Sequence, residues 1–249
     1  MLQGQTIVIP PPALLSRAME QQAIPFKGSI AAPQQQSVRW VGSLQKALNL
    51  GVLGADLTYL VNYGQTPQIP ACFASIGALS HDLDLMQDVD SSIVVAIENG
   101  MEDPVQLLGL HSEFFRSMEN YLKKNQRGDI SAGILIGGWV ESLYLIASLS
   151  DSTTTLDPLL AEQRYSAQGV LQLAKDIQDS TMIEILGDLE PLCEAFADLE
   201  HSYSFRDPMH DRREHITYLR SQSKVEFDID QIEQLHALIR QTRQRIITP

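Results

Sequence analysis

Hydrophobic positions along most of this chain recur every three to four residues, the spacing of one face of an α-helix. From about residue 38 onward, short interruptions at Gly, Pro, Asn and Asp separate these periodic segments. The pairs at 103–104 and 157–158 each place a proline in the first helical turn behind a capping Asp. Strand-like alternation is confined to 5–9 and 225–227. The pattern predicts an all-α fold, an antiparallel helical array or bundle of about eight helices.

The start and stop signals also predict how the chain is divided. Residues 1–37 are expected to form an N-terminal arm or linker with one short helix at 13–22, because prolines and a glutamine run interrupt the rest. Residues 38–249 are expected to form a single helical domain. Its predicted helices cover approximately 38–63, 67–86, 91–99, 104–125, 130–149, 158–177, 180–201 and 228–246.

Composition narrows the range of partners. Lys and Arg number 18 against 31 Asp and Glu, so the net charge is −13 and nucleic acid is not an expected partner. The segment 130–149 is long and apolar, but Glu141 near its middle favours a buried central helix over a membrane span. Cys72 and Cys193 each lie in an apolar helical pattern, which favours buried side chains, and whether they pair is left open.

Two predicted helices contain small residues at helical spacing. In 48–63 these include Gly51 and Gly54, and in 137–144 they are Gly137 and Gly138. A glycine inside a helix costs about 1 kcal/mol relative to alanine, so a compensating contact is expected. Close approach of two helix backbones supplies such a contact, and we interpret these four glycines as helix-crossing positions.

Each of these helices also carries one acid among apolar neighbours, Asp56 in the first and Glu141 in the second. A buried carboxylate needs a partner or a raised pKa. One interpretation is a helix crossing with hydrogen-bonded acids. The other is a polar pocket in which the two acids meet and perform acid–base chemistry or hold a cation. That candidate pocket would be lined by Tyr59, Asn62, Tyr63, Trp139 and Tyr144.

Established catalytic and metal-binding motifs are missing from the sequence. The acidic run from Asp82 to Asp90 lacks the turn glycine and terminal Glu of a calcium-binding loop. Glu233 and His236 have the spacing of one half of a di-iron site, but the second half is not present. No nucleophile elbow, phosphate loop or dinucleotide fingerprint occurs. The sequence predicts no metal site and no cofactor.

Two segments carry a resemblance to a known family: KALNLGVLGADLTYLVNYGQ at 46–65 and IGGWVESLYLIA at 136–147. Over about residues 38–200 the chain resembles an uncharacterised family of all-helical bacterial envelope proteins, many of them predicted lipoproteins. The resemblance implies a helical fold and an envelope setting, and it transfers no catalytic or ligand-binding residue. The periplasm or cell envelope is expected if Met1 begins a trimmed mature chain, and the cytoplasm otherwise.

Together these features predict a non-catalytic helical module that binds a protein partner or a small ligand in the bacterial envelope. The alternative is a carboxylate-pair or metal-assisted enzyme that uses Asp56 and Glu141. A homo-oligomer is compatible with the sequence, although no coiled-coil heptad run specifies one.

Overall fold

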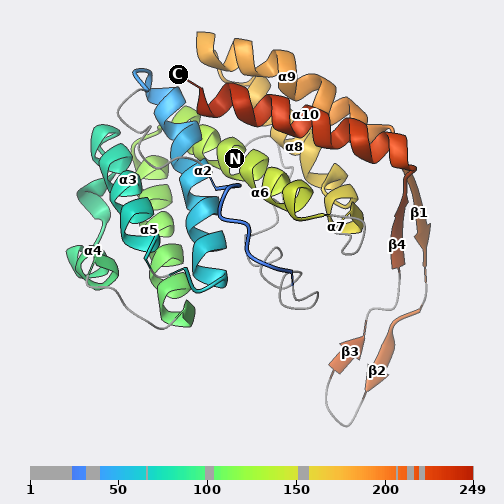
Figure 1. The fold of residues 1–249 in the computed structure, drawn as a ribbon, viewed down its shortest axis with the longest axis horizontal. Helices are drawn as coiled ribbons and strands as arrows, with labels where there is room; N and C mark the ends of the chain where they lie inside the picture. The colour runs from blue at the N-terminus through green and yellow to red at the C-terminus, as the bar shows by residue number, and fades with distance from the viewer. Residues whose placement is uncertain are drawn as a thin grey trace.

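The computed structural model describes residues 24–31, 40–65, 67–98, 104–150, 157–205, 207–211, 216–218 and 222–248. Within these residues the fold is an array of nine α-helices, which confirms the all-α prediction (Figure 1). The short helix expected at 13–22 lies outside the described residues. The helices are α2 (Ser43–Asn62), α3 (Ile69–Asp82), α4 (Ser91–Glu98), α5 (Pro104–Lys124), α6 (Gly128–Leu149), α7 (Asp157–Ala161), α8 (Arg164–Lys175), α9 (Ser180–Ala197) and α10 (Ile229–Ile247), with a 3₁₀ turn η2 (Met86–Asp88).

Helices α2 and α6 form the centre of the molecule and pack more extensively against each other than any other pair of described elements. Every residue of α2 from Ala47 to Val61 is buried. Helices α3, α4 and α5 lie on one side of this pair, and α8, α9 and α10 lie on the other (Figure 1).

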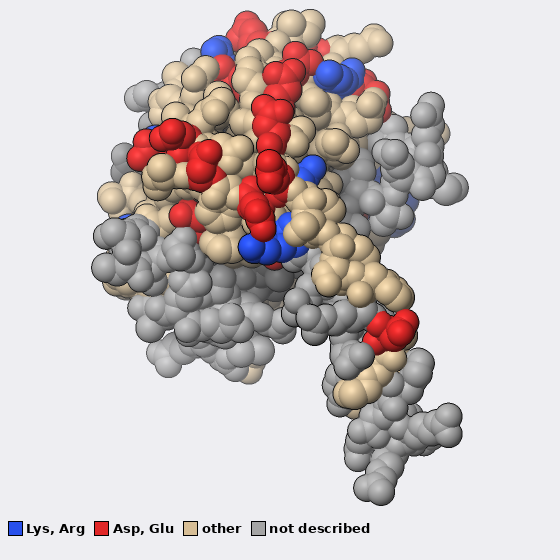
Figure 2. Space-filling model, turned by 90° about the vertical axis from the view of Figure 1, so that its right-hand side faces the viewer, with Lys and Arg blue, Asp and Glu red and all other residues tan. Residues whose placement is uncertain are grey.

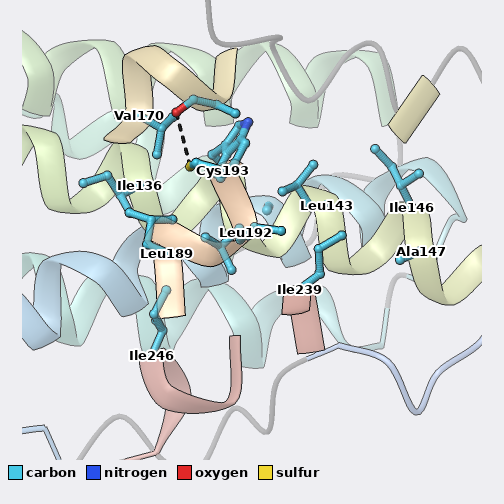
Figure 3. Packing of buried hydrophobic residues seen from close by; sticks show 14 of the residues in the cluster. Ile136, Leu143, Ile146, Ala147, Val170, Leu189, Leu192, Cys193, Ile239 and Ile246 are labelled. Atoms are coloured by element: carbon cyan, nitrogen blue, oxygen red, sulfur yellow. Dashed lines mark hydrogen bonds between the residues drawn. The ribbon is translucent and has the colours of Figure 1, made fainter. Parts of the chain in front are cut away.

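Two apolar clusters fill the spaces on either side of the central pair. The first combines residues of α2, α6, α8, α9 and α10, and includes Leu143, Leu189, Leu192 and Ile239, which interdigitate in Figure 3. The second combines α2 with α3 and α5 and includes the T-shaped ring pair of Phe73 and Phe114. Because α2 contributes to both clusters, it is buried around its whole circumference.

Helix α6 is the one described helix that is long and apolar enough to cross a membrane. In this fold 67% of the most apolar 18-residue stretch of α6 is buried inside the protein. Such burial is that of a core helix.

Two acids of the run from Asp82 to Asp90 form ion pairs with lysines, and the two cysteines are not paired with each other. Asp82 pairs with Lys46 at 2.6 Å and Asp88 pairs with Lys124 at 2.7 Å, so these acids form surface ion pairs. The thiols of Cys72 and Cys193 are both free and buried, in different apolar clusters.

The structure corrects the sequence prediction at two places. The helix expected over 158–177 is divided into α7 and α8. The irregular region after α9 is a long antiparallel hairpin, in which β1 (Glu200–Ser204) pairs with β4 (Gln222–Glu226), and β2 (Met209–Asp211) pairs with β3 (Ile216–Tyr218). We call the segment 200–226 the hairpin arm, because its described strands extend away from the helical body (Figure 1). Its strands are too short to show a strong alternating pattern, which is why the sequence did not predict it.

The side of the body from which the hairpin arm extends is predominantly acidic. Figure 2 shows Asp and Glu side chains gathered into a band there, with few Lys or Arg side chains between them. Helix α9 exposes Glu184, Glu194 and Asp198. This surface repels polyanions, in line with the net charge.

Candidate functional site

The crossing of α2 and α6 brings the two helix backbones into contact. A Cβ placed on Gly137 would lie 1.9 Å from the carbonyl oxygen of Leu48, and a Cβ on Gly51 would lie 1.9 Å from that of Ile134. No side chain fits at either distance. A Cβ on Gly138 would lie 3.3 Å from the Gly51 oxygen. The three glycines therefore allow α2 and α6 to touch along their main chains.

Gly54 serves a different contact. The atom nearest to a Cβ placed there is Cζ of Phe115 on α5, at 2.7 Å. Of the four glycines interpreted as crossing positions, Gly54 thus accommodates an aromatic ring of α5, and the α2–α6 contact is formed by the other three.

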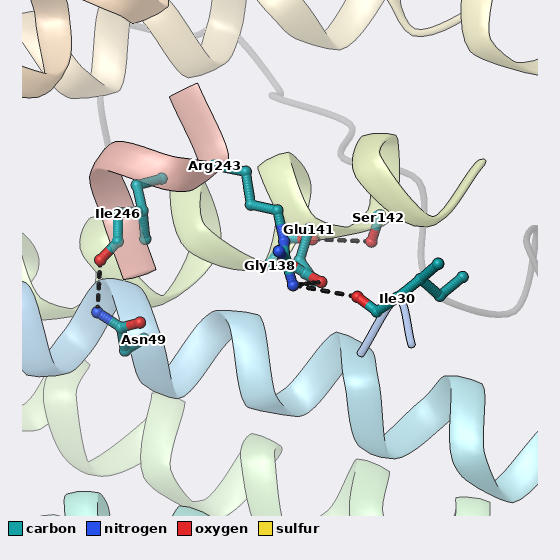
Figure 4. Close-up of polar contacts among 7 residues, drawn as sticks. All are labelled: Ile30, Asn49, Gly138, Glu141, Ser142, Arg243 and Ile246. Carbon is teal, nitrogen blue, oxygen red and sulfur yellow. Dashed lines mark hydrogen bonds and ion pairs between the residues drawn. The ribbon is translucent and has the colours of Figure 1, made fainter. Parts of the chain in front are cut away.

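Just beyond the crossing, Glu141 of α6 forms a buried ion pair with Arg243 of α10 (Figure 4). Arg243 Nε donates to Glu141 Oε2 at 2.7 Å, and Nη2 donates to Oε1 at 2.9 Å. Nη2 also donates to the carbonyl oxygen of Ile30 at 3.1 Å. The guanidinium carbon lies 3.9 Å from the centre of the Tyr144 ring, within cation–π distance. The arginine is therefore held by a carboxylate, a backbone carbonyl and an aromatic face.

Asp56 of α2 completes this group, and its side chain is hydrogen-bonded to that of Glu141. Burial raises the pKa of Glu141, while Arg243 and the bond with Asp56 act in the opposite direction. We call Asp56, Glu141, Tyr144 and Arg243 the acid–arginine cluster.

The two acids and the arginine of this cluster are buried, whereas Tyr144 is half-buried. Glu141 is 0% exposed, Asp56 is 1% exposed and Arg243 is 7% exposed. A surface hollow of about 680 Å³ lies elsewhere, between the amino ends of α2 and α9 and the carboxyl end of α10, and no residue of the cluster lines it. An external substrate would need access to Asp56 and Glu141, and the described residues around them bury both side chains. This buried group of paired side chains instead fixes how α2, α6 and α10 are arranged.

The carboxyl end of α10 is fixed by a second polar contact with α2. The Nδ2 of Asn49 donates to the carbonyl oxygen of Ile246 at 2.9 Å, and the Nε2 of Gln45 donates to the same oxygen at 2.6 Å. The last carbonyls of a helix lack partners within the helix. The amides of Asn49 and Gln45 supply hydrogen-bond donors to one of these carbonyls. They thereby fix the position of α10, and with it that of Arg243, relative to α2 and α6.

Residues 24–31 lie across the cluster, and we call them the strap. The backbone amide of Lys27 donates a hydrogen bond to Tyr59 Oη at 3.0 Å. Tyr59 Oη in turn donates to the backbone carbonyl oxygen of Lys27 at 3.3 Å. The Lys27 ammonium donates to the Ser148 carbonyl at the end of α6, at 2.9 Å. Ile24 and Ile30 are buried in the first apolar cluster.

The other residues of the predicted pocket take different positions. Trp139 does not line the cluster: its Nε1 donates to Ser166 Oγ at 2.9 Å and its ring packs near Phe196. Trp139 and Glu141 are two residues apart on a helix and therefore face opposite sides. Tyr63 packs its ring against Tyr59, and Asn62 is half-buried at the end of α2.

Sequence reasoning missed Arg243, which pairs with Glu141. The local signal was available, because Arg243 lies four residues after Ile239 and three before Ile246 on the apolar face of α10. A charged residue on such a face needs a buried partner of opposite charge. The sequence does not specify which acid that is.

In the described part of the chain, no three His, Cys, Asp or Glu side chains gather as a metal site would require. Comparison of the chain with protein-family models, curated protein sequences and solved structures finds no match. The site is therefore interpreted from its own geometry.

Proposed function

We propose that this protein is a non-catalytic helical module that binds another protein, and that the hairpin arm is the surface it presents. The observation that carries this proposal is a group of large, exposed apolar side chains. They belong to an element that stands away from the body (Figure 1). They are Tyr203 at 61% exposure, Phe205 at 69%, Met209 at 49% and Ile216 at 45%.

The geometry of the arm suits a binding role. In β1, residues two apart point to one face, so Tyr203 lies on the same face as His201, whose strand partner is Val225. Val225 packs against the body, and the ring of His201 contacts Tyr165 of α8 at 5.5 Å. These contacts hold the base of the arm, at His201 and Val225, against the helical body. The apolar side chains farther along the arm remain exposed to solvent.

A two-stranded ribbon is marginally stable by itself, and its outer edges have unpaired backbone groups. Contact with a partner would bury the apolar face and pair an edge. The arm is also electrically balanced: residues 200–226 contain five basic and five acidic residues, so the negative excess lies in the rest of the chain. A partner can approach the arm without strong repulsion.

The acid–arginine cluster supports the non-catalytic part of the proposal. The enzyme alternative needs Asp56 and Glu141 in an accessible pocket, whereas both are sealed and Arg243 occupies the place of a cation. The resemblance to bacterial envelope proteins favours a periplasmic or envelope setting for the binding role.

Site-specific photo-crosslinking tests the proposal. A benzophenone amino acid is introduced at Phe205 of the full chain in the cells that make it, and separately at Ile183 of α9. Ile183 is a matched control because it is 68% exposed but lies on the helical body. We expect one discrete adduct from position 205, identified by mass spectrometry, and none from position 183.

A Tyr203→Thr change in the position-205 protein should remove the adduct, because threonine keeps the strand preference but not the ring. An adduct that contains only peptides of this chain would identify a second copy as the partner. Equal adducts at both positions, or none, would contradict the proposal.

A further inference from the structure

We propose that the groove under the strap is a peptide-recognition site that the chain's own residues 24–31 occupy, and that it accepts a partner segment of the same chemistry in their place. The strap would then be a built-in competitor. This inference does not depend on the hairpin arm, since it concerns a different face of the body and different residues.

The strap is bound as a peptide ligand is bound. Its Phe26 ring stacks on Tyr59 at 5.4 Å and contacts Tyr63 at 5.5 Å, so two rings of α2 form an aromatic seat. Ile24 and Ile30 are 4% and 7% exposed and insert on either side of that seat. Three side-chain anchors fixed by a few backbone hydrogen bonds are the usual means of recognising an extended segment.

The walls of the groove are held together without the strap. Helices α2 and α6 touch at Gly51 and Gly137, and α10 is fixed by Asn49 and by the Glu141–Arg243 pair. None of these contacts uses a strap residue. Removal of the strap would therefore leave a shaped groove in place.

The groove also specifies the chemistry of its occupant. Arg243 Nη2 needs a carbonyl acceptor, which Ile30 supplies, and Tyr59 Oη both accepts from an amide and donates to a carbonyl. The Ser148 carbonyl accepts from an ammonium group at the carboxyl end of α6, where a cation is favoured. An extended protein segment with an aromatic residue followed by lysine, and aliphatic residues two before and four after the aromatic, meets all these needs.

The strap is short and has little regular backbone hydrogen bonding of its own. Within the described residues it pairs with no strand, and its internal order is one turn in which the Ile30 amide donates to the Lys27 carbonyl at 3.3 Å. Segments with such sparse backbone bonding open at the lowest free energies in a fold. A competing segment therefore needs to displace only this element.

Titration of a labelled peptide into full-length protein tests the inference. The probe is a capped peptide with the sequence of residues 24–31 (IPFKGSIA), and its fluorescence anisotropy is followed with wild type, with Lys27→Ala and with Phe26→Ala/Lys27→Ala. Weakening the strap lowers its competition from within the chain. Affinity should rise in that order, by at least about tenfold over the series, because an aromatic seat and a charged contact are freed.

Two controls make the result specific. A peptide in which alanine replaces the Phe and Lys should bind the double variant at least about tenfold more weakly. The exposed substitution Ile183→Ala should leave the affinity of wild type unchanged. The inference would be overturned if the peptide bound wild type and both strap variants with the same affinity, or if the control peptide bound as tightly as the probe. Should the double variant fail to fold, both peptides are compared on the Lys27→Ala protein instead. That protein loses only one half-buried side-chain contact.

Discussion

Arg243 and Glu141 lie 102 positions apart in the chain and meet through two parallel hydrogen bonds of 2.7 and 2.9 Å. This bidentate pair joins the last helix to the central one in a region closed to solvent. Arginine suits the position because its planar guanidinium can bind a carboxylate, a carbonyl and a ring face at the same time. The pair thus holds α10 against α6, and its arginine also binds the strap through the Ile30 carbonyl.

Loss of the arginine should be costly. In Arg243→Met, Glu141 remains buried without its partner, and we expect the free energy of unfolding to fall by about 3–5 kcal/mol. Urea unfolding followed by circular dichroism measures the change. The double variant Glu141→Gln/Arg243→Met should regain a large part of the loss, because no charge is then left alone. A single variant as stable as wild type would contradict the buried pair.

The raised pKa of Glu141 predicts that the stability of the fold depends on pH. Because burial raises the pKa of Glu141, the folded chain holds a proton that the unfolded chain releases above the ordinary value of 4.5. This contribution to stability is complete below pH 4.5 and is lost as the pH rises through the folded pKa. Glu141→Gln keeps the shape of the side chain but removes the titrating group, so its unfolding free energy should not decline over that range. Parallel curves for the two proteins would refute the raised pKa of Glu141.

His111 predicts a slope of the opposite sign. Its ring is buried beside Phe115 at 4.7 Å, and burial lowers the pKa of His111 from 6.5 to about 4. The unfolded chain therefore takes up a proton first, and the stability from the neutral ring is complete above pH 6.5 and is lost as the pH falls toward 4. The difference corresponds to about 3 kcal/mol. Replacement by leucine should flatten the acid side of the stability curve, which unfolding at pH 7 and pH 4.5 measures.

The helix crossing predicts opposite effects at two glycines. Gly137→Ala would place a methyl group 1.9 Å from the Leu48 oxygen and should reduce the unfolding free energy by about 3 kcal/mol or more. Gly109→Ala in α5 meets no atom within 4 Å and should stabilise the helix by up to about 1 kcal/mol. Thermal unfolding of both variants beside wild type decides between this crossing and looser packing.

The two cysteines should be unreactive while the chain is folded. Burial raises the pKa of the Cys193 thiol to about 12 and that of Cys72 well above its ordinary value, so little thiolate exists at pH 8. A chromogenic thiol reagent should detect both thiols in guanidinium and neither rapidly in buffer. A chain with no thiols after unfolding would show that they pair.

Helix positions were predictable because their signals are local. Asp103–Pro104 precedes α5 and Asp228 caps α10 through a capping box with Gln231, patterns that the sequence displays directly. The small residues of α2 and α6 likewise indicate close packing from composition alone.

Long-range pairing was not predictable in the same way. The strands of the hairpin arm are three to five residues long, and their register depends on partners up to 26 positions away, as for Glu200 and Glu226. The choice of Arg243 as partner of Glu141 depends on how α10 lies across α6. Neither is encoded in a local pattern, because both arise only when distant helices pack together.

The shared position of α2 between the two apolar clusters limits how this protein can be modified by recombination. Leu48 faces one cluster and Leu50 the other, so one helix closes two interiors. A gene exchange that parted α2 from α6 would expose both at once and leave two fragments with open cores. Both interiors therefore stay closed only if α2 and α6 are kept together, and we expect inserted segments to be tolerated best at the edges of the fold, where the hairpin arm already stands.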